Sequence, residues 1–236
     1  LVLAPLMIQS AFAAIALDRT RIVFDGGQKS VSLSVSNENK QLPYLAQAWL
    51  EDEKGNKVSS PLTVLPPVQR IEPGAQSQVR IQSVGAEKSL PQERESLFYF
   101  NLREIPPRSD KPNTLQIALQ TRVKLFYRPA ALMIQSNSIP WQEKLTLTRQ
   151  GDRYVVNNPT PYYVTLVDAS SSVKGLSAKD FEAVMIAPNG QAPIKPGAEA
   201  LGDSPVLTYI NDYGGRPQLK FTCSGSNCKA SPVKSK

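Results

Sequence analysis

Short runs of alternating apolar and polar residues, separated by turns marked with proline and glycine, recur along most of the chain. Residues 30–36 read SVSLSVS, and residues 44–50 read YLAQAWL and precede the turn signal Lys54-Gly55-Asn56. Alternation with a period of two is typical of β-strands with one buried face, and closely spaced turns join such strands into hairpins. The 20 prolines among 236 residues exceed the average of roughly 5% and argue against long helices. We therefore expect an all-β protein with no helix longer than two turns.

The spacing of these runs predicts two domains. About seven strands are expected before residue 130, which is the strand count of an immunoglobulin-like sandwich. Residues 129–141 change in character and suggest a domain edge, and a second β-rich segment follows, with strands expected near 144–148, 154–156, 162–167, 181–186, 206–210 and 218–222. We expect an N-terminal domain over residues 14–130 and a C-terminal domain over residues 131–236, each within the usual range of domain size.

The longest alternating run covers residues 113–129, NTLQIALQTRVKLFYRP. Leu115, Ile117 and Leu119 alternate with polar or small residues, which predicts one long strand over 113–128 with a single apolar face. The opposite face is polar, so burial on both sides is not expected. The apolar row belongs either to the core of this protein or to a partner that pairs with the strand.

Residues 1–13, LVLAPLMIQSAFA, are apolar, uncharged and end in Ala11-Phe12-Ala13. This small-x-small ending is typical of a signal peptide, here without its basic start, and predicts a mature, exported chain from Ala14. The alternative is a buried N-terminal strand. No other apolar run approaches the ~18 residues that span a bilayer, so no membrane insertion is expected.

Cys223 and Cys228 are the only cysteines, and the chain has no histidine. In an oxidising compartment, this spacing favours a disulfide that closes a hairpin. Half of a zinc site is the alternative, but no further cysteine or histidine exists to complete it. We expect no metal and no cofactor.

Motifs that carry catalysis are missing from the sequence. It has no G-x-S-x-G elbow and no phosphate-binding glycine loop. The acidic run Glu51-Asp52-Glu53 adjoins a turn signal and is better explained as a solvated hairpin end than as a catalytic pair. The net charge of +7 is dispersed, which makes nucleic-acid binding a weak hypothesis. We expect a protein that is not an enzyme and binds no nucleic acid.

Three basic residues have two possible roles. Arg21, Lys124 and Arg128 are, taken singly, ordinary surface charges or members of ion pairs. Two cations that converge in a cleft would instead hold a carboxylate through charge-assisted hydrogen bonds worth ~1.5–3 kcal/mol each. Their spacing in the sequence does not show whether they converge.

Several longer segments are specific enough to indicate a family. They are LDRTRIVFDGG (17–27), NENKQLPYLAQAWLEDE (37–53), PPVQRIEPGAQSQVR (66–80), RESLFYFNLREIPPRSDK (94–111), LQIALQTRVKLFYRPAA (115–131) and TYINDYGGRP (208–217). Over nearly the whole mature chain the sequence resembles the periplasmic pilus (fimbrial) assembly chaperones. The resemblance implies two immunoglobulin-like β-sandwich domains in an L-shaped arrangement with a cleft between them.

The resemblance also implies a function and partners. Members of this family act in the periplasm in the chaperone–usher pathway. They capture pilus subunits, both pilins and tip adhesins, complete each subunit's fold with a donated strand, and deliver it to the outer-membrane usher. Because an unoccupied donor strand is an exposed edge, weak self-association of the free protein is also expected.

Matching the motifs residue by residue implies specific roles. Leu115, Ile117 and Leu119 would enter the subunit's groove. Arg21 and Lys124 would anchor the subunit's C-terminal carboxylate. Glu95, Arg128 and Asp212 would form a charged triad that fixes the angle between the domains, and Cys223 and Cys228 match a disulfide found in one branch of the family.

One feature conflicts with simple alternation. Leu115, Ile117 and Leu119 have odd numbers and Lys124 an even one, so in a flat strand they face opposite sides. Twist or a β-bulge between Gln120 and Lys124 is expected if both groups touch one partner.

The alternative function is that of a secreted two-domain adhesin or receptor that binds carbohydrate. Such a protein would group exposed aromatic residues on its loops. Trp49 and Trp141 are far apart in the sequence and give that hypothesis little support.

Overall fold

The computed structural model describes residues 13–109, 115–135 and 138–233. Within these residues the chain forms two compact units. The first is built from residues through Asp18, Ser30–Val84 and Tyr99–Val123, and the second from Arg19–Lys29, Gly85–Phe98 and the chain from Lys124 onward. The boundary expected at residue 130 stays a prediction.

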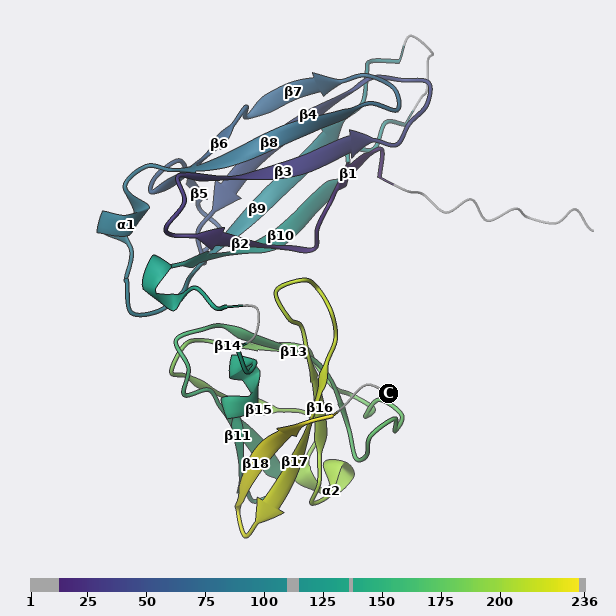
Figure 1. Cartoon of the computed structure of the whole chain (residues 1–236). Helices are drawn as coiled ribbons and strands as arrows, with labels where there is room; N and C mark the ends of the chain where they lie inside the picture. The colour runs from purple at the N-terminus through teal and green to yellow at the C-terminus, as the bar shows by residue number, and fades with distance from the viewer. Residues whose placement is uncertain (1–12, 110–114, 136–137, 234–236) are drawn as a thin grey trace, which may run out of the picture. The chain divides into compact units, whose positions relative to one another are not determined.

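A four-stranded antiparallel sheet has the order β1-β3-β8-β6. Its strands are β1 (Ile15–Leu17), β3 (Ser30–Asn37), β8 (Gln76–Ser83) and β6 (Leu62–Leu65). The alternating run at 30–36 forms β3, which lies beside β8 (Figure 1) with Leu33 opposite Val79. Both side chains are buried, so the period of two in the sequence does correspond to one buried face.

A second sheet has the order β2-β10-β9-β4-β5, and β7 also pairs with β4. These strands are β2 (Arg21–Asp25), β10 (Gln120–Arg128), β9 (Ser96–Ile105), β4 (Tyr44–Glu51), β5 (Lys57–Val58) and β7 (Val68–Ile71). The predicted turn at Lys54-Gly55-Asn56 joins β4 to β5, and Gly55 takes a positive φ of 84° there. A left-handed backbone favours glycine because it has no Cβ.

The core of the first unit consists of alternate residues from strands of both sheets. Leu33, Val35, Val79 and Ile81 come from the first sheet, and Ala46, Ala48, Leu50, Phe100 and Leu102 come from the second. All are at most 3% exposed. Two sheets that each bury one face in this way form a β-sandwich.

The second unit contains an eight-stranded sheet with the order β14-β13-β16-β17-β18-β11-β12-β15. Its strands are β11 (Thr146–Gln150), β12 (Arg153–Asn157), β13 (Val164–Ser170), β14 (Val184–Ile186), β15 (Gln191–Ile194), β16 (Val206–Tyr209), β17 (Gln218–Ser224) and β18 (Asn227–Pro232). Tyr154, Leu207 and Phe221 are among its fully buried side chains. Cys223 and Cys228 form a disulfide across the β17–β18 hairpin, which confirms the predicted pairing.

Helices are few and short in the described part of the chain. The α-helices α1 (Ala86–Ser89) and α2 (Ala198–Leu201) have four residues each. Of the two 3-10 helices, η1 (Ala130–Leu132) lies in the segment 129–141 predicted to be a domain edge, and η2 (Trp141–Lys144) begins at its last residue. The all-β prediction is confirmed, and the strands that pattern reading missed are mostly the short ones, β1, β5, β6, β7, β15 and β18.

The long strand predicted over 113–128 is shorter in the structure. Residues 113 and 114 lie outside the described residues, residues 115–119 have no regular secondary structure, and β10 begins at Gln120. Leu115 is 83% exposed, Ile117 62% and Leu119 38%. The expectation of a strand before Gln120 was therefore wrong for the free chain, because the second sheet offers this segment little backbone pairing.

The apolar row nevertheless continues a buried row. Val123, Leu125 and Tyr127 have odd numbers like Leu115 and Ile117, and all three are at most 9% exposed. In β10 the odd side chains fill the core of this protein, whereas the odd side chains just before β10 are exposed. The row therefore passes from an exposed part into a buried part, and Ile117 does not belong to the protein's own core.

Substitutions on the two parts of this row should have different effects on stability. We expect Ile117→Asp to change the free energy of unfolding by less than ~0.5 kcal/mol, as is usual at exposed sites. Leu125→Ala, on the same row but fully buried, should cost ~2–5 kcal/mol through cavity formation. Urea unfolding of both variants measures the difference, and a large loss of stability for Ile117→Asp would place that residue in the core.

Candidate functional site

Arg128 is the centre of a buried ion-pair network in the second unit. The residue closes β10 and its side chain is 3% exposed. Arg128 Nε donates to Glu95 Oε1 at 2.8 Å, and its two terminal nitrogens donate to the two carboxylate oxygens of Asp212 at 2.7 and 3.0 Å. Glu95 directly precedes β9, and Asp212 lies in the turn after β16. The structure thus brings together the three residues of the predicted triad, although their role in fixing a domain angle stays a prediction.

Each charged group of the network has a hydrogen-bond partner, although two carboxylates face one guanidinium. The second oxygen of Glu95 accepts from the backbone N–H of Tyr163 at 2.7 Å. Burial by itself would lower the pKa of Arg128, but the hydrogen bonds that it donates to Asp212 and the negative charges of Glu95 and Asp212 raise it above its ordinary value. A buried bidentate guanidinium–carboxylate pair of this kind is held firmly in one geometry.

Two aromatic side chains, which the sequence did not assign to this site, pack against the Arg128 network. The Arg128 guanidinium lies 5.0 Å from the ring centre of Trp141 and 5.2 Å from that of Tyr162. The two rings are 4.8 Å apart, and the Tyr162 hydroxyl donates to the carbonyl of Leu132 at 2.8 Å. Trp141 is therefore occupied by internal packing, which gives no support to a carbohydrate-binding aromatic platform at this position.

Arg21 and Lys124 lie side by side. β2 and β10 are parallel neighbours, and Lys124 is the Cα partner of Arg21, the first residue of β2. Arg21 Nη1 donates to the carbonyl of Ile210 at 3.2 Å, and Lys124 Nζ lies 3.5 Å from Thr165 Oγ1. Convergence, which the sequence spacing could not show, follows from this parallel register.

Neither of these two cations forms an ion pair with the described residues. Burial lowers the pKa of Arg21, and burial together with the positive charge of Arg21 lowers the pKa of Lys124. Arg21 Nε is also buried without a hydrogen-bond partner among the described residues. The nearest carboxylates, Glu95 and Asp212, are already bound by Arg128. The negative charges of these carboxylates partly oppose the effect of burial on Arg21, but three cations, Arg21, Lys124 and Arg128, face only two carboxylates. The site therefore carries a net positive charge and unfilled donors, which suit a carboxylate or another small anion.

The structure keeps Lys124 on the opposite face of the strand from the odd-numbered residues of the apolar row. Lys124 shares a face with its partner Arg21, while its neighbours Val123 and Leu125 are buried in the core. The ladder between β2 and β10 is regular from Lys124 to Arg128. A bulge that re-aims Lys124 is not seen in this ladder, and any twist introduced between Gln120 and Lys124 by a partner stays a prediction.

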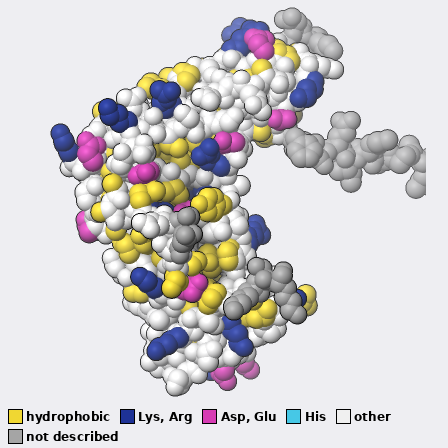
Figure 2. All heavy atoms as spheres, in the orientation of Figure 1, with side chains coloured by type: hydrophobic (Ala, Val, Ile, Leu, Met, Phe, Trp, Pro, Cys, Tyr) yellow, Lys and Arg dark blue, Asp and Glu magenta, His cyan; other side chains and the backbone are white. Residues whose placement is uncertain are grey.

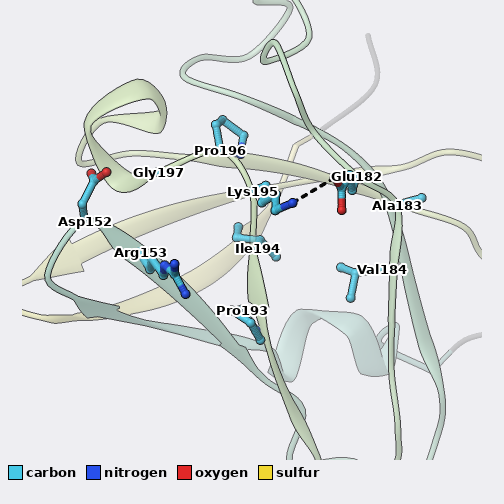
Figure 3. Close-up of a pocket in the computed structure, with 10 residues that line it drawn as sticks. All are labelled: Asp152, Arg153, Glu182, Ala183, Val184, Pro193, Ile194, Lys195, Pro196 and Gly197. Carbon is cyan, nitrogen blue, oxygen red and sulfur yellow. Dashed lines mark hydrogen bonds and ion pairs between the residues drawn. The ribbon is translucent and has the colours of Figure 1, made fainter.

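The other concavity of note lies at the two end strands of the eight-stranded sheet. Figure 3 shows this cavity of about 420 Å³, with Val184 from β14 and Pro193 and Ile194 from β15. Lys195 Nζ donates to Glu182 at 3.0 Å across it, and both side chains are largely exposed. Its lining carries two acidic and two basic side chains, Asp152, Glu182, Arg153 and Lys195, so its charge does not favour an anion.

Basic side chains do not form a continuous patch on the face shown in Figure 2. On the face shown in Figure 2, lysine and arginine side chains are scattered among uncharged ones. This agrees with the dispersed charge of the sequence. Among the described residues, no group of three or more potential metal ligands is found, and no helix is both long and apolar enough to cross a membrane.

Two β-rich units, one with an exposed apolar row before an edge of β10 and the other with an unmatched cation pair, define a class of protein. It is a two-domain immunoglobulin-like β-sandwich protein. Comparison with known proteins gives the family. Residues 14–133 match the N-terminal domain, and residues 140–221 the C-terminal domain, of the PapD pili assembly chaperones.

Individual proteins similar to this chain belong to the same family. The chain is 53% identical to the chaperone protein PapD of Escherichia coli, over 97% of this chain and 94% of that protein. It is 42% identical to the chaperone protein PmfD of Proteus mirabilis, over 98% and 91%. The chain therefore belongs to the PapD-like pilus assembly chaperone family.

Solved structures support the same fold. The periplasmic chaperone SfaE superposes with a TM-score of 0.70 at 31% identity, covering 89% of this chain and all of SfaE. The SafB chaperone, solved in complex with the Salmonella enterica SafA pilin, gives a TM-score of 0.74 at 25% identity, covering 91% and 99%. The predicted two-domain immunoglobulin-like fold is confirmed.

Removing Arg128 should destabilise the second unit strongly. Arg128→Met would leave Glu95, itself 2% exposed, with an uncompensated buried charge, at a cost of ~3–5 kcal/mol. The double variant Arg128→Met/Glu95→Gln should recover much of this loss. Chemical unfolding of the two variants tests the interpretation, which is wrong if the double variant is no more stable than the single one.

Removing the charge of Lys124 should stabilise the free protein. Because the pKa of Lys124 is lowered from 10.5 in the folded chain, the unfolded chain binds more protons between the folded pKa and 10.5, and stability rises with pH in that window. Lys124→Met should therefore gain up to ~1 kcal/mol at neutral pH, the scale of a partly exposed charge interaction. Urea unfolding at pH 7 and pH 10 measures both effects, and the variant should lack most of the rise at alkaline pH.

Proposed function

We propose that this chain is a periplasmic chaperone of the chaperone–usher pathway, which captures pilus subunits by donating a strand and anchoring their C-terminal carboxylate. One observation carries the proposal. β2 begins at Arg21, directly opposite Lys124, so that β10 has no strand on that side over residues 120–123 within the described chain. An unpaired edge and an unmatched cation pair therefore meet at one point.

The direction of β2 defines how a partner would bind. β2 is parallel to β10. A partner strand that pairs with the free edge before Lys124, and that extends the line of β2, would also run parallel to β10. Its C-terminus would end where β2 starts, and its terminal carboxylate would lie between Arg21 and Lys124. The cation pair thus suits the last residue of a captured chain.

The exposed apolar row supplies contact area for the same partner. A pilus subunit that lacks a strand exposes an apolar groove and unpaired backbone groups, which is a template for aggregation. Each backbone hydrogen bond that pairing restores contributes ~0.5–1.5 kcal/mol. Full burial of Leu115, Ile117 and Leu119 adds up to ~1.5–3 kcal/mol for each side chain.

The anchor and the apolar row have different tasks. The row supplies most of the area, but a shift by one residue would turn every side chain to the other face. A carboxylate held by two fixed cations defines one end of the partner strand. The anchor therefore sets the register of the complex more than its affinity.

Relatives support the proposed partners and location. SafB was solved with a pilin, and SfaE is described as a periplasmic chaperone. We propose pilins and a tip adhesin as cargo, the outer-membrane usher as the recipient, and export with removal of residues 1–13. The family match begins at residue 14, where the mature chain is expected to start, although residues 1–12 lie outside the described residues.

We also propose that the protein is not an enzyme. The titratable groups of the site are two unpaired cations and one buried ion-pair network. This set binds and orients an anion, whereas general acid–base chemistry requires groups that exchange protons near neutral pH. Release of the subunit would follow from exchange with a strand that fits the groove better.

Loss of either cation should abolish productive capture without unfolding the chaperone. Arg21→Ala or Lys124→Ala removes charge-assisted hydrogen bonds worth ~1.5–3 kcal/mol, which corresponds to ~10- to 150-fold in affinity. The measurement is the yield of pilus subunits that co-purify with the chaperone from periplasm, identified by mass spectrometry. Lys179→Ala, an exposed lysine of the second unit, is the control. Normal subunit yields with both anchor variants would contradict the assignment.

A further inference from the structure

The first residue of β10, Gln120, forms side-chain hydrogen bonds with two residues of the neighbouring strand. Gln120 Nε2 donates to Asn101 Oδ1 at 2.9 Å. Gln120 Oε1 accepts from Arg103 Nη2 at 2.9 Å and from Arg103 Nε at 3.3 Å. Asn101 and Arg103 both belong to β9 and lie two residues apart, so they share a face of the sheet. A single glutamine amide thus uses both its donor and its acceptor on the neighbouring strand.

The two partners of Gln120 are themselves fixed. Asn101 is fully buried and lies directly opposite Trp49 of β4. The Arg103 guanidinium lies 5.0 Å from the Trp49 ring centre, and Lys57 Nζ lies 4.7 Å from the same ring. Trp49 Nε1 donates to Glu51 at 2.9 Å. The indole is therefore held by two cations and a carboxylate, and it supports the strand that receives Gln120.

The next side chain on this face of β10 is held in the same way. Arg122 Nε donates to Glu51 Oε2 at 3.0 Å, and its guanidinium lies 3.5 Å from the ring centre of Tyr99. Before Gln120 in the chain, the Gln116 side chain donates to the carbonyl of Pro107. Three even-numbered side chains thus bind to this protein, while the odd-numbered Leu115, Ile117 and Leu119 stay exposed.

Backbone pairing alone does not define this register. The ladder bond from Glu104 N to the carbonyl of Leu119 is 3.0 Å long, but equivalent groups recur along any strand, so a slip by one residue can preserve such bonds. A slip by one residue would bring the side chain of Leu119 or Thr121 to the position that Gln120 occupies between Asn101 and Arg103. Leucine offers no polar group, and threonine is too short to reach both partners, so the buried Asn101 oxygen would lose its donor.

We propose that Gln120, held by Asn101 and Arg103, is a register clamp that decides which side chains of residues 115–119 are presented to a captured subunit. These three are positioning residues, since none of them need touch the subunit. The inference rests on the proposed function for its consequence, but the clamp itself is a property of the free chain and can be tested there.

The first test uses the isolated chaperone. Gln120→Met keeps the length of the side chain and removes both hydrogen bonds, and Gln82→Met, at an exposed glutamine of β8, is the matched control. In the wild type and the control, nuclear Overhauser contacts should link residues 119 and 104. In Gln120→Met these contacts should fall at least several-fold or shift by one residue. Unchanged contacts in Gln120→Met would overturn the proposal.

The second test reads the register in the complex. Ile117→Cys and Ala118→Cys are made in the wild-type and Gln120→Met backgrounds, and a maleimide labels each purified chaperone–subunit complex. The native cysteines are paired with each other and stay unlabelled. With the clamp intact, position 117 should be protected and position 118 labelled, differing by ~10-fold or more, and without it the ratio should approach one. An unchanged ratio would overturn the clamp.

A reciprocal exchange separates positioning from general stability. In Gln120→Arg/Arg103→Gln, the introduced guanidinium can donate both to Asn101 and to the introduced amide, so the labelling ratio should return toward the wild-type value. Failure of the exchange to restore the ratio, with an unchanged urea midpoint, counts against the clamp. If instead the clamp variants change the register but Arg21→Ala captures subunits normally, the anchor of the proposed function fails and the clamp stands.

Discussion

The Arg128 network is the interaction on which the rest of the site depends. The Arg128 guanidinium forms ion pairs with both Glu95 and Asp212. These two carboxylates act on Arg21 only through their charge, without an ion pair. Arg21 and Lys124 are therefore left beside each other with unmatched charge in a partly buried setting. A buried ion pair contributes little net stability compared with apolar packing. Its effect here is to leave Arg21 and Lys124 without an ion pair among the described residues.

The side chains of β10 have three different environments, the core, the ion-pair network of Arg128 and the exposed surface, because the two faces and the two edges of the strand differ. The odd-numbered Val123, Leu125 and Tyr127 of β10 fill the core. The even-numbered positions hold Gln120, Arg122, Lys124 and Arg128, together with the buried Phe126. One edge pairs with β9 throughout, and the other pairs with β2 only from Lys124 onward. The transition from core strand to exposed segment occurs where β2 and its hydrogen bonds end. Strand alternation can therefore stay regular while the environment of each side chain changes.

An exposed apolar row and an open edge are liabilities in a free protein. In this chain both are short and lie next to charged or polar residues, and the even side chains that flank the row are held by the protein itself. Holding the segment in one register reduces the conformational entropy that binding must remove. The same bonds that limit misfolding of the segment would thus favour capture.

The class of fold and the residues of interest could be predicted from the amino-acid sequence. Period-two alternation, proline-rich turns and the paired cysteines predicted an all-β protein with a C-terminal disulfide, and the motifs resembling pilus chaperones named Arg21, Lys124 and the triad. Their proximity could not be read from spacing, because Arg21 and Lys124 meet through a parallel register and Arg128 meets Asp212 across many residues of chain. Only the tertiary structure decided that residues 115–119 leave the sheet, since strand formation requires a partner strand as well as a pattern. It also decided which cations are paired, because that depends on which carboxylates the fold brings within hydrogen-bonding distance.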